Sequence, residues 1–316
     1  MGGRDSGSRL LVGVATIILL AGCAAGASPT PVPASPTPTS MPSATLATPT
    51  LAPAEPSPST SAANYWPFVE SFCPGASEQP LNLVALGMSE TAGYGIRSDE
   101  LYSPQEAYPG QYASILCAEL GRTVELHSYF PSQSYNEWAT LAWWKEKLSG
   151  DKGLRDDLAA ASVVVLWAMG SHDVVPALAL GACGGAWPDP LKACFEAATA
   201  KIPAQTDELF GAISTLVPGG VSVLAADAYL PPAVLRRWAG QPYWEQLRPI
   251  IDPRPAIEPL ALKYGFRFAD TETAFNGRTG TAMPADGLFQ ADGLHPTAEG
   301  SLAIAKVIAE ADGLGN

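Results

Sequence analysis

A short apolar run that ends in a glycine-containing turn most constrains what this chain folds into. The run occupies residues 81–86, Gly87 follows it, and Ser89 opens a turn that extends to Gly95. A continuous apolar run of this length is typical of a buried strand in a parallel sheet. Ligands of open α/β sheets collect beyond the carboxyl ends of such strands, so Ser89 lies where a nucleophile is expected. Taken alone, Ser89 is better explained as a helix N-cap or a turn residue.

Strand-like and helix-like stretches alternate along the rest of the chain. This alternation predicts an α/β fold with a mainly parallel sheet that is covered by helices on both faces. No second linker interrupts residues 65–316, which are therefore expected to form one domain. After residues 81–86, strands are expected at residues 123–127, 162–168, 221–226 and 266–269. Helices are expected at residues 108–120, 135–148, 154–161, 197–216, 256–264 and 297–311.

The first 23 residues have the pattern of a secretory signal. Arg4 and Arg9 precede a short apolar stretch at residues 10–20, and small residues lead to Cys23. The apolar stretch is too short to span a bilayer, which needs about 20 residues. The sequence Leu-Ala-Gly-Cys at residues 20–23 resembles the bacterial lipobox, which implies that Cys23 becomes the lipidated first residue of the mature protein. The alternative is an ordinary secreted protein that is cleaved nearby.

Residues 24–64 change composition completely. They hold ten of the chain's 30 prolines among Ala, Ser and Thr, and Glu55 is their only charged residue. Such a segment cannot bury enough apolar surface to offset chain entropy, so disorder is expected. We interpret it as a tether between the domain and a membrane surface. Signal and tether together predict an extracytoplasmic protein that is lipid-anchored at the cell surface.

Composition excludes several other functions. The formal net charge of −13 argues against nucleic-acid binding. The sequence contains neither a Walker A pattern nor a dinucleotide fingerprint, and it has no internal repeat. No organic cofactor is therefore expected.

Cysteine use is consistent with export. Apart from Cys23, the chain has Cys73, Cys117, Cys183 and Cys194, an even number for an oxidising compartment, and three pairings are possible. A Cys183–Cys194 bridge is favoured, because it would close a stretch that reads as an irregular loop, and it leaves Cys73 with Cys117. Zinc is the rival interpretation, but no pair has Cys-x-x-Cys spacing, so no metal is expected.

The three histidines limit the choice of a catalytic base. His127, His172 and His295 all fall at expected strand ends or in loops. A serine nucleophile needs a base for its proton and a carboxylate that orients the imidazole. Asp292 and His295 lie three residues apart in Asp-Gly-Leu-His-Pro, a turn that presents both from one loop. The alternative for Asp292 is a turn or N-cap acid before the last helix.

Three segments resemble, in order, the sequence blocks of the SGNH/GDSL hydrolases. Residues 87–95 resemble the block Gly-Asp-Ser-x-Thr-x-Gly, and Gly-Ser-His-Asp at residues 170–173 resembles Gly-x-Asn-Asp. Residues 292–296 match the block Asp-x-x-His-Pro without a change. The resemblance covers roughly residues 81–312. It implies a three-layer α/β/α sandwich of the flavodoxin-like type, and ester hydrolysis or acyl transfer.

The resemblance also implies roles for individual residues. Ser89, Asp292 and His295 would form the catalytic triad. His172 stands where the family has an oxyanion-binding asparagine, and an imidazole can also donate a hydrogen bond there, together with the Ser89 amide. Gly170 would let the backbone approach the substrate closely.

Two further positions depart from the family pattern. Met88 replaces the usual acid beside the nucleophile, and the glycine of the second block is not recognisable in residues 127–134. Asp173, which matches the family pattern, is expected to cap or brace its loop. Because one missing oxyanion donor costs about 10²–10³ in rate, these departures bear mainly on the level of activity.

The sequence therefore predicts an extracytoplasmic ester hydrolase that acts on a lipid or an acylated carbohydrate and needs no metal or cofactor. Its partners would be this small-molecule ester and, through the anchor, a membrane. One alternative is a non-catalytic surface binding module that keeps the fold; the altered blocks favour it and the intact final block opposes it. The other is an acyltransferase with the same triad, and no residue of the sequence distinguishes it from a hydrolase.

Overall fold

The structure, a computed structural model, describes residues 65–75, 79–131, 139–174, 191–229, 244–280 and 282–314. The predicted signal, the predicted tether and Cys23 lie outside these residues. The described residues form a six-stranded sheet of order β1-β3-β2-β4-β5-β6. The strands are β1 (Tyr65–Phe72), β2 (Leu81–Leu86), β3 (Val124–Pro131), β4 (Val163–Trp167), β5 (Ser222–Ala226) and β6 (Arg267–Ala269).

All neighbouring strands are parallel except β1, which runs antiparallel to β3. Counted in chain order, the parallel strands lie in the order 2-1-3-4-5, which is the flavodoxin-like arrangement. The predicted fold class is thus confirmed. The edge strand β1 was not predicted, because Pro67 interrupts its sequence. Proline is tolerated at the edge of a sheet, where one side of the strand needs no partner.

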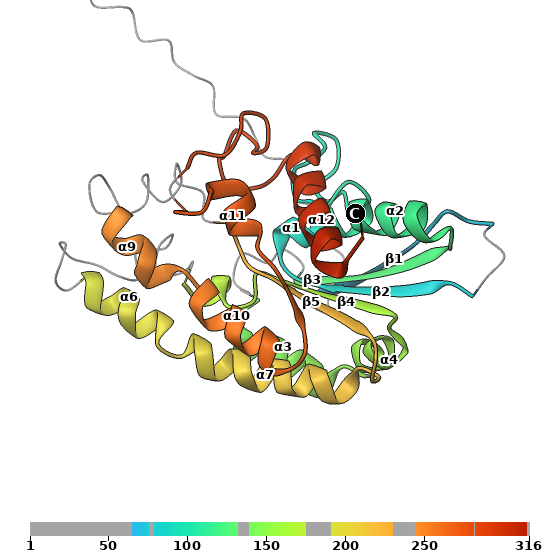
Figure 1. Ribbon diagram of the computed structural model, residues 1–316, viewed down its shortest axis with the longest axis horizontal. Coiled ribbons are helices and arrows are strands. Elements are labelled where there is room, and N and C mark those ends of the chain that lie inside the picture. Colours follow the sequence, from blue (N-terminus) through green and yellow to red (C-terminus); the bar gives the residue numbers. More distant parts are fainter. Residues whose placement is uncertain are drawn as a thin grey trace, which may run out of the picture. The chain divides into compact units, whose positions relative to one another are not determined.

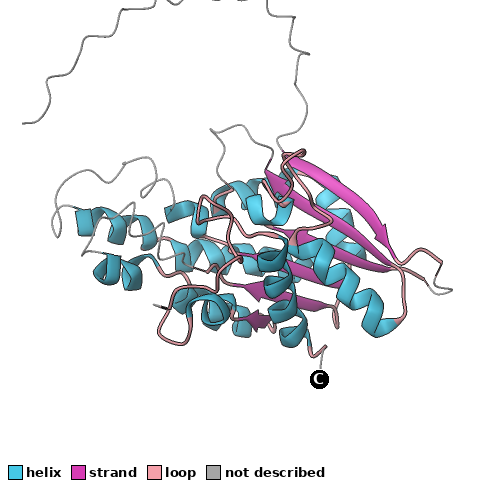
Figure 2. Cartoon of the chain, turned by 90° about the horizontal axis from the view of Figure 1, so that it is seen from above, coloured by secondary structure: helices cyan, strands magenta, loops and turns pink. Residues whose placement is uncertain are grey.

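Helices cover both faces of the sheet, as Figure 1 and Figure 2 show. On one face, α2 (Tyr108–Leu120) packs against α12 (Ala298–Asp312). On the other face, α7 (Ile202–Leu216) contacts α3 (Leu141–Gly150), α4 (Lys152–Ala160) and α10 (Arg254–Lys263). The remaining described helices are α1 (Ser89–Ala92), α6 (Leu191–Thr199), α9 (Trp244–Ile251) and α11 (Thr271–Asn276). Among the residues that the structure describes, none of the helices has the length and apolarity of a membrane span.

The central strands owe their burial to this coverage. Every residue of β4 is buried, and only Asn82 of β2 is partly exposed. The helix expected at residues 197–216 proves to be two, since α6 ends at Thr199 and α7 begins at Ile202. Pro203 lies in the first turn of α7, where its missing N–H costs no hydrogen bond, so it marks a helix start.

The parallel strands end at one edge of the sheet, and their following loops carry the residues of interest. Because β2 and β4 are neighbours, the segments that carry Ser89 and His172 leave the sheet side by side. This is also the point where the strand order reverses, the usual ligand site of such sheets. His127 is an exception. It lies inside β3, and its Nδ1 is 2.8 Å from Asp157 Oδ2, which corrects the expectation that it ends a strand.

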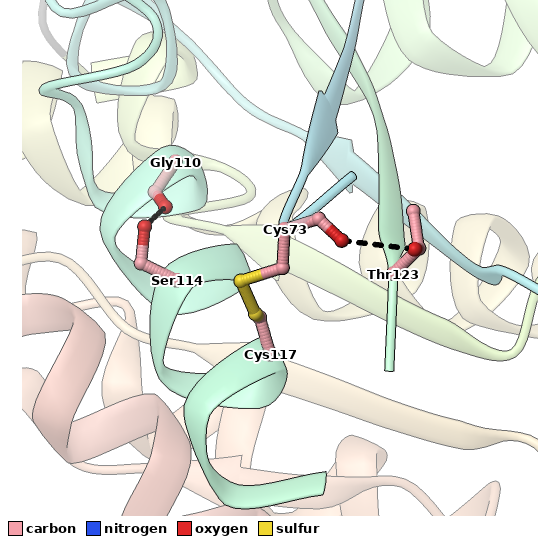
Figure 3. The surroundings of a disulfide bond; sticks show 5 residues. All are labelled: Cys73, Gly110, Ser114, Cys117 and Thr123. Carbon is pink, nitrogen blue, oxygen red and sulfur yellow. Dashed lines mark hydrogen bonds between the residues drawn. A yellow bond between two sulfur atoms is a disulfide. The ribbon is translucent and has the colours of Figure 1, made fainter. Parts of the chain in front are cut away.

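A disulfide joins Cys73, which follows β1, to Cys117 of α2 (Figure 3). The Cα atoms are 6.3 Å apart, and Thr123 Oγ1 donates to the Cys73 carbonyl at 3.0 Å. This pairing is confirmed. Cys194 is also disulfide-bonded. Cys183 lies outside the described residues, so its pairing with Cys194 stays a prediction.

Candidate active site

Ser89 is presented by a tight turn between β2 and α1. Gly87 is buried there, and a Cβ at this position would overlap the Thr91 side chain and lie 3.0 Å from Trp167 Cβ. Only glycine fits so close to its neighbours. Ser89 follows as the first residue of α1, and Gly93 ends that helix with a φ of 69°. The sequence therefore places the serine hydroxyl directly beyond the carboxyl end of a rigid central strand.

The structure brings Ser89, His295 and Asp292 together. Ser89 Oγ lies 3.1 Å from His295 Nε2, and His295 Nδ1 lies 2.6 Å from Asp292 Oδ2. The other oxygen of Asp292 accepts the backbone amides of Leu294 and His295, at 2.8 and 3.0 Å. Because the carboxylate faces Nδ1, the neutral imidazole carries its hydrogen there, and Nε2 is left to accept the serine proton.

The Asp292 carboxylate stays charged in this arrangement. Burial alone would raise its pKa, but the hydrogen bonds from the His295 ring and from the amides of Leu294 and His295 bring the pKa below its ordinary value. A charged carboxylate holds the imidazole ring in place and stabilises the imidazolium that forms when the ring takes a proton.

His172 lies in the helical segment that begins at Ser171, shortly after β4, and is oriented by the backbone. Its Nδ1 accepts the amide of Ala139 at 3.1 Å, so the neutral ring carries its hydrogen on Nε2. Burial, and secondly the charge of His295, lower the pKa of His172 to about 3. At neutral pH this imidazole is therefore a neutral hydrogen-bond donor. Residues 132–134, part of the stretch 127–134 where the second block was not recognisable, lie outside the described residues.

The turn and the helical segment after β4 are braced on both sides. Asp173 Oδ2 accepts the amide of Leu141 at the start of α3, at 2.9 Å, which is the bracing role expected of it. Ser171 Oγ lies 3.4 Å from the sulfur of Met88, which is buried where the family pattern has an acid. Gly170 has a φ of 94°, and a Cβ there would lie 3.1 Å from Ile202 Cγ2. This turn and packing account for the glycine, and its contact with a substrate stays a prediction.

Three residues that sequence reasoning missed hold the turn of His295. Gln290 Nε2 donates to the carbonyl oxygens of Tyr94 and Pro296, at 2.7 and 2.9 Å. The Tyr94 ring lies 4.7 Å from the His295 ring, centroid to centroid. Tyr229, which follows β5, donates its hydroxyl to the Leu294 carbonyl at 2.8 Å. Except for the bond from Gln290 to Pro296, these contacts join segments far apart in the chain, and no local sequence pattern signals them.

Glu90 was not identified from the sequence either, although it directly follows the nucleophile. Its Oε2 lies 3.2 Å from Ser89 Oγ, so the serine hydroxyl has a carboxylate as well as an imidazole within hydrogen-bond distance. Among the described residues, no group of three or more His, Cys, Asp or Glu side chains could hold a metal ion.

No protein-family model matches the chain, and no curated protein matches it. Among solved structures, a lipase from a goat rumen metagenome is 16% identical, with 73% of this chain and 97% of that chain covered and a TM-score of 0.50. A phospholipase A1 from Streptomyces albidoflavus NA297 is 16% identical, with 73% and 99% covered and a TM-score of 0.47. A carbohydrate acetylesterase family member from Sinorhizobium meliloti is 15% identical, with 74% and 100% covered and a TM-score of 0.39. The likeness to the rumen lipase shows that this chain shares its α/β fold.

Proposed function

We propose that this protein is a serine ester hydrolase of the SGNH type that acts on a carboxylic ester. The observation that carries the proposal is the chain of contacts from Ser89 Oγ to His295 Nε2 at 3.1 Å and from His295 Nδ1 to Asp292 at 2.6 Å. A serine hydroxyl is a weak nucleophile until such a base accepts its proton. The shared fold with a lipase is consistent with this chemistry.

The reaction follows from the positions of these groups. Ser89 Oγ attacks the ester carbonyl while His295 Nε2 takes its proton, and Asp292 stabilises the resulting imidazolium. The Nε2–H of His172 and the Ser89 amide donate to the oxyanion of the tetrahedral intermediate. His295 then gives the proton to the leaving alcohol. A water molecule, deprotonated by His295, releases the acyl group and regenerates Ser89.

The substrate class and the location of the enzyme extend this proposal. The ester is part of a lipid or of an acylated carbohydrate. The enzyme works outside the cytoplasmic membrane, held by a lipid on Cys23 and a tether of residues 24–64. The signal-like residues 1–23 and the proline-rich composition of the tether support this location.

Labelling by a fluorophosphonate tests the proposal directly, because the reagent phosphonylates only an activated serine. We expect peptide mapping to find the label on Ser89, and Ser89→Ala and His295→Ala to abolish labelling and turnover of 4-nitrophenyl acetate. The double variant should be scarcely worse than either single one, since the residues act as a unit. Ser149→Ala, an exposed serine at the end of α3, is the matched control and should label like the parent.

The alternatives predict different results. An acyltransferase would also label, but it would transfer the acetyl group to an added alcohol in preference to water. A folded protein that does not label at Ser89 and does not turn over the ester would refute the enzyme and leave the binding module.

A further inference from the structure

The carboxylate of Glu90 lies at the reacting atom of the proposed site. Its Oε2 is 3.2 Å from Ser89 Oγ, and both residues are half-buried at the mouth of the turn after β2. Within the described part of the chain, no Lys or Arg forms an ion pair with Glu90. Its negative charge is therefore not neutralised by a neighbouring side chain among these residues.

A second carboxylate adds to this charge. Asp292 lies on the other side of His295 and also makes no ion pair with a Lys or Arg among the described residues. Both acids act on the buried hydroxyl of Tyr229. Burial is the first cause that raises the pKa of Tyr229 well above its ordinary value, and the charges of Glu90 and Asp292 raise it further. A substrate that reaches Ser89 thus enters a negative field.

Aromatic rings lie next to His295, which itself contacts Asp292. The half-buried Tyr94 ring packs 4.7 Å from the His295 ring, and Tyr102 lies next to it at 6.3 Å. Ammonium groups bind to the faces of tyrosine rings, and sites for quaternary ammonium combine such rings with negative charge. Anionic groups gain nothing from either feature.

We propose that Glu90 makes the site selective for esters that carry an ammonium group close to the scissile bond. This inference rests on the proposed ester hydrolysis and specifies its substrate. Glu90 also acts on the oxyanion and on the imidazolium, but in the same way for every ester. The ratio of kcat/KM between a cationic and a neutral ester of equal shape therefore isolates the interaction between Glu90 and the substrate.

The size of the preference follows from Coulomb's law. For unit charges about 8 Å apart in a half-buried, partly screened site, the attraction corresponds to roughly tenfold in kcat/KM. The preference should shrink as salt is added, because the Debye length falls from about 10 Å at 0.1 M to about 3 Å at 1 M.

Acetylcholine and 3,3-dimethylbutyl acetate form the matched substrate pair, since the second replaces the ammonium nitrogen by carbon. We expect the parent protein to favour acetylcholine by about tenfold and to disfavour the anionic 2-sulfoethyl acetate. Glu90→Gln keeps the hydrogen-bond acceptor and removes the charge, so the ratio should fall toward one. Glu119→Gln removes an exposed charge near the far end of α2 and should keep the parent's ratio.

Two results would overturn the inference: equal kcat/KM for the two esters in the parent, or an unchanged preference in Glu90→Gln. Thermal unfolding of each variant shows whether it is folded. Turnover of the neutral ester without a preference would reject this inference and leave the proposed function intact. Absence of both Ser89 labelling and turnover of any ester would reject both.

Discussion

The carboxamide of Gln290 connects the two segments that carry the nucleophile and the base. It donates to the Tyr94 carbonyl, in the turn after Ser89, and to the Pro296 carbonyl, next to His295. Gln290→Met keeps a side chain of similar length and removes both donors. The turn that carries the base would then be held to the nucleophile's segment mainly by the Tyr94–His295 ring contact and the contact between Ser89 and His295.

The expected loss follows from the number of hydrogen bonds. Each is worth about 0.5–1.5 kcal/mol net, so the pair favours the aligned arrangement by about 1–3 kcal/mol. If the aligned population falls accordingly, kcat drops by about fivefold to somewhat over a hundredfold, since tenfold in rate corresponds to about 1.4 kcal/mol. The KM should change little, because the Gln290 carboxamide bonds to backbone carbonyls of the protein.

Steady-state turnover of 4-nitrophenyl acetate and the rate of Ser89 phosphonylation measure the effect. Both should fall together in Gln290→Met, while thermal unfolding shifts by only a few degrees. Gln111→Met, on the partly buried surface of α2, controls for the loss of a carboxamide elsewhere. Phosphonylation at the parent's rate in the Gln290 variant would show that the two loops are aligned without this side chain.

Three further outcomes are expected. His172→Asn should keep much of the activity, whereas His172→Ala should lose about 10²-fold or more in kcat; equal, small losses would refute a donor role. Burial raises the pKa of Asp227 to about 7, so the folded state binds more protons than the unfolded chain between about pH 4 and 7. Stability should fall as pH rises through that window, and urea titrations at pH 5 and 8 should show a smaller difference for Asp227→Asn. Cys23→Ser should release the protein from the membrane fraction; unchanged partitioning would reject the anchor.

Helices and strands whose limits are marked by their own local sequence were predictable. The bounds expected for β2 and α2 agree with the structure, because one is a continuous apolar run and the other is bounded by Pro109 in its first turn and by Gly121 at its end. The expected end of β3 was wrong by several residues. The polar pair His127 and Ser128 interrupts the alternation of apolar and polar residues, yet the strand continues, because β2 pairs with it as far as Tyr129 and β1 as far as Pro131.

The same distinction applies to the residues of the site, some of which carry a local sequence signal and some of which do not. Asp292 and His295 were recognisable because one turn brings them together and the carboxylate itself accepts the amides of that turn. Gln290 and Tyr229 were not, because each acts on a backbone carbonyl, and a carbonyl leaves no trace in the sequence. Glu90 was not predicted, because a single acid after a serine is ordinarily explained as a solvated residue in the first turn of a helix.

Local and long-range contacts therefore have separate tasks in this site. The turn of residues 292–296 sets the geometry between Asp292 and His295 through contacts within the turn itself. The distance between His295 and Ser89 depends instead on β2, on the packing of α12 and on the bonds of Gln290. One of these bonds reaches Tyr94, which lies 196 residues away in the chain. A substitution in the turn should alter the basicity and orientation of the imidazole, whereas one at Gln290 should alter only how often that imidazole meets the serine. The first kind changes the pH profile of kcat, and the second scales kcat at every pH.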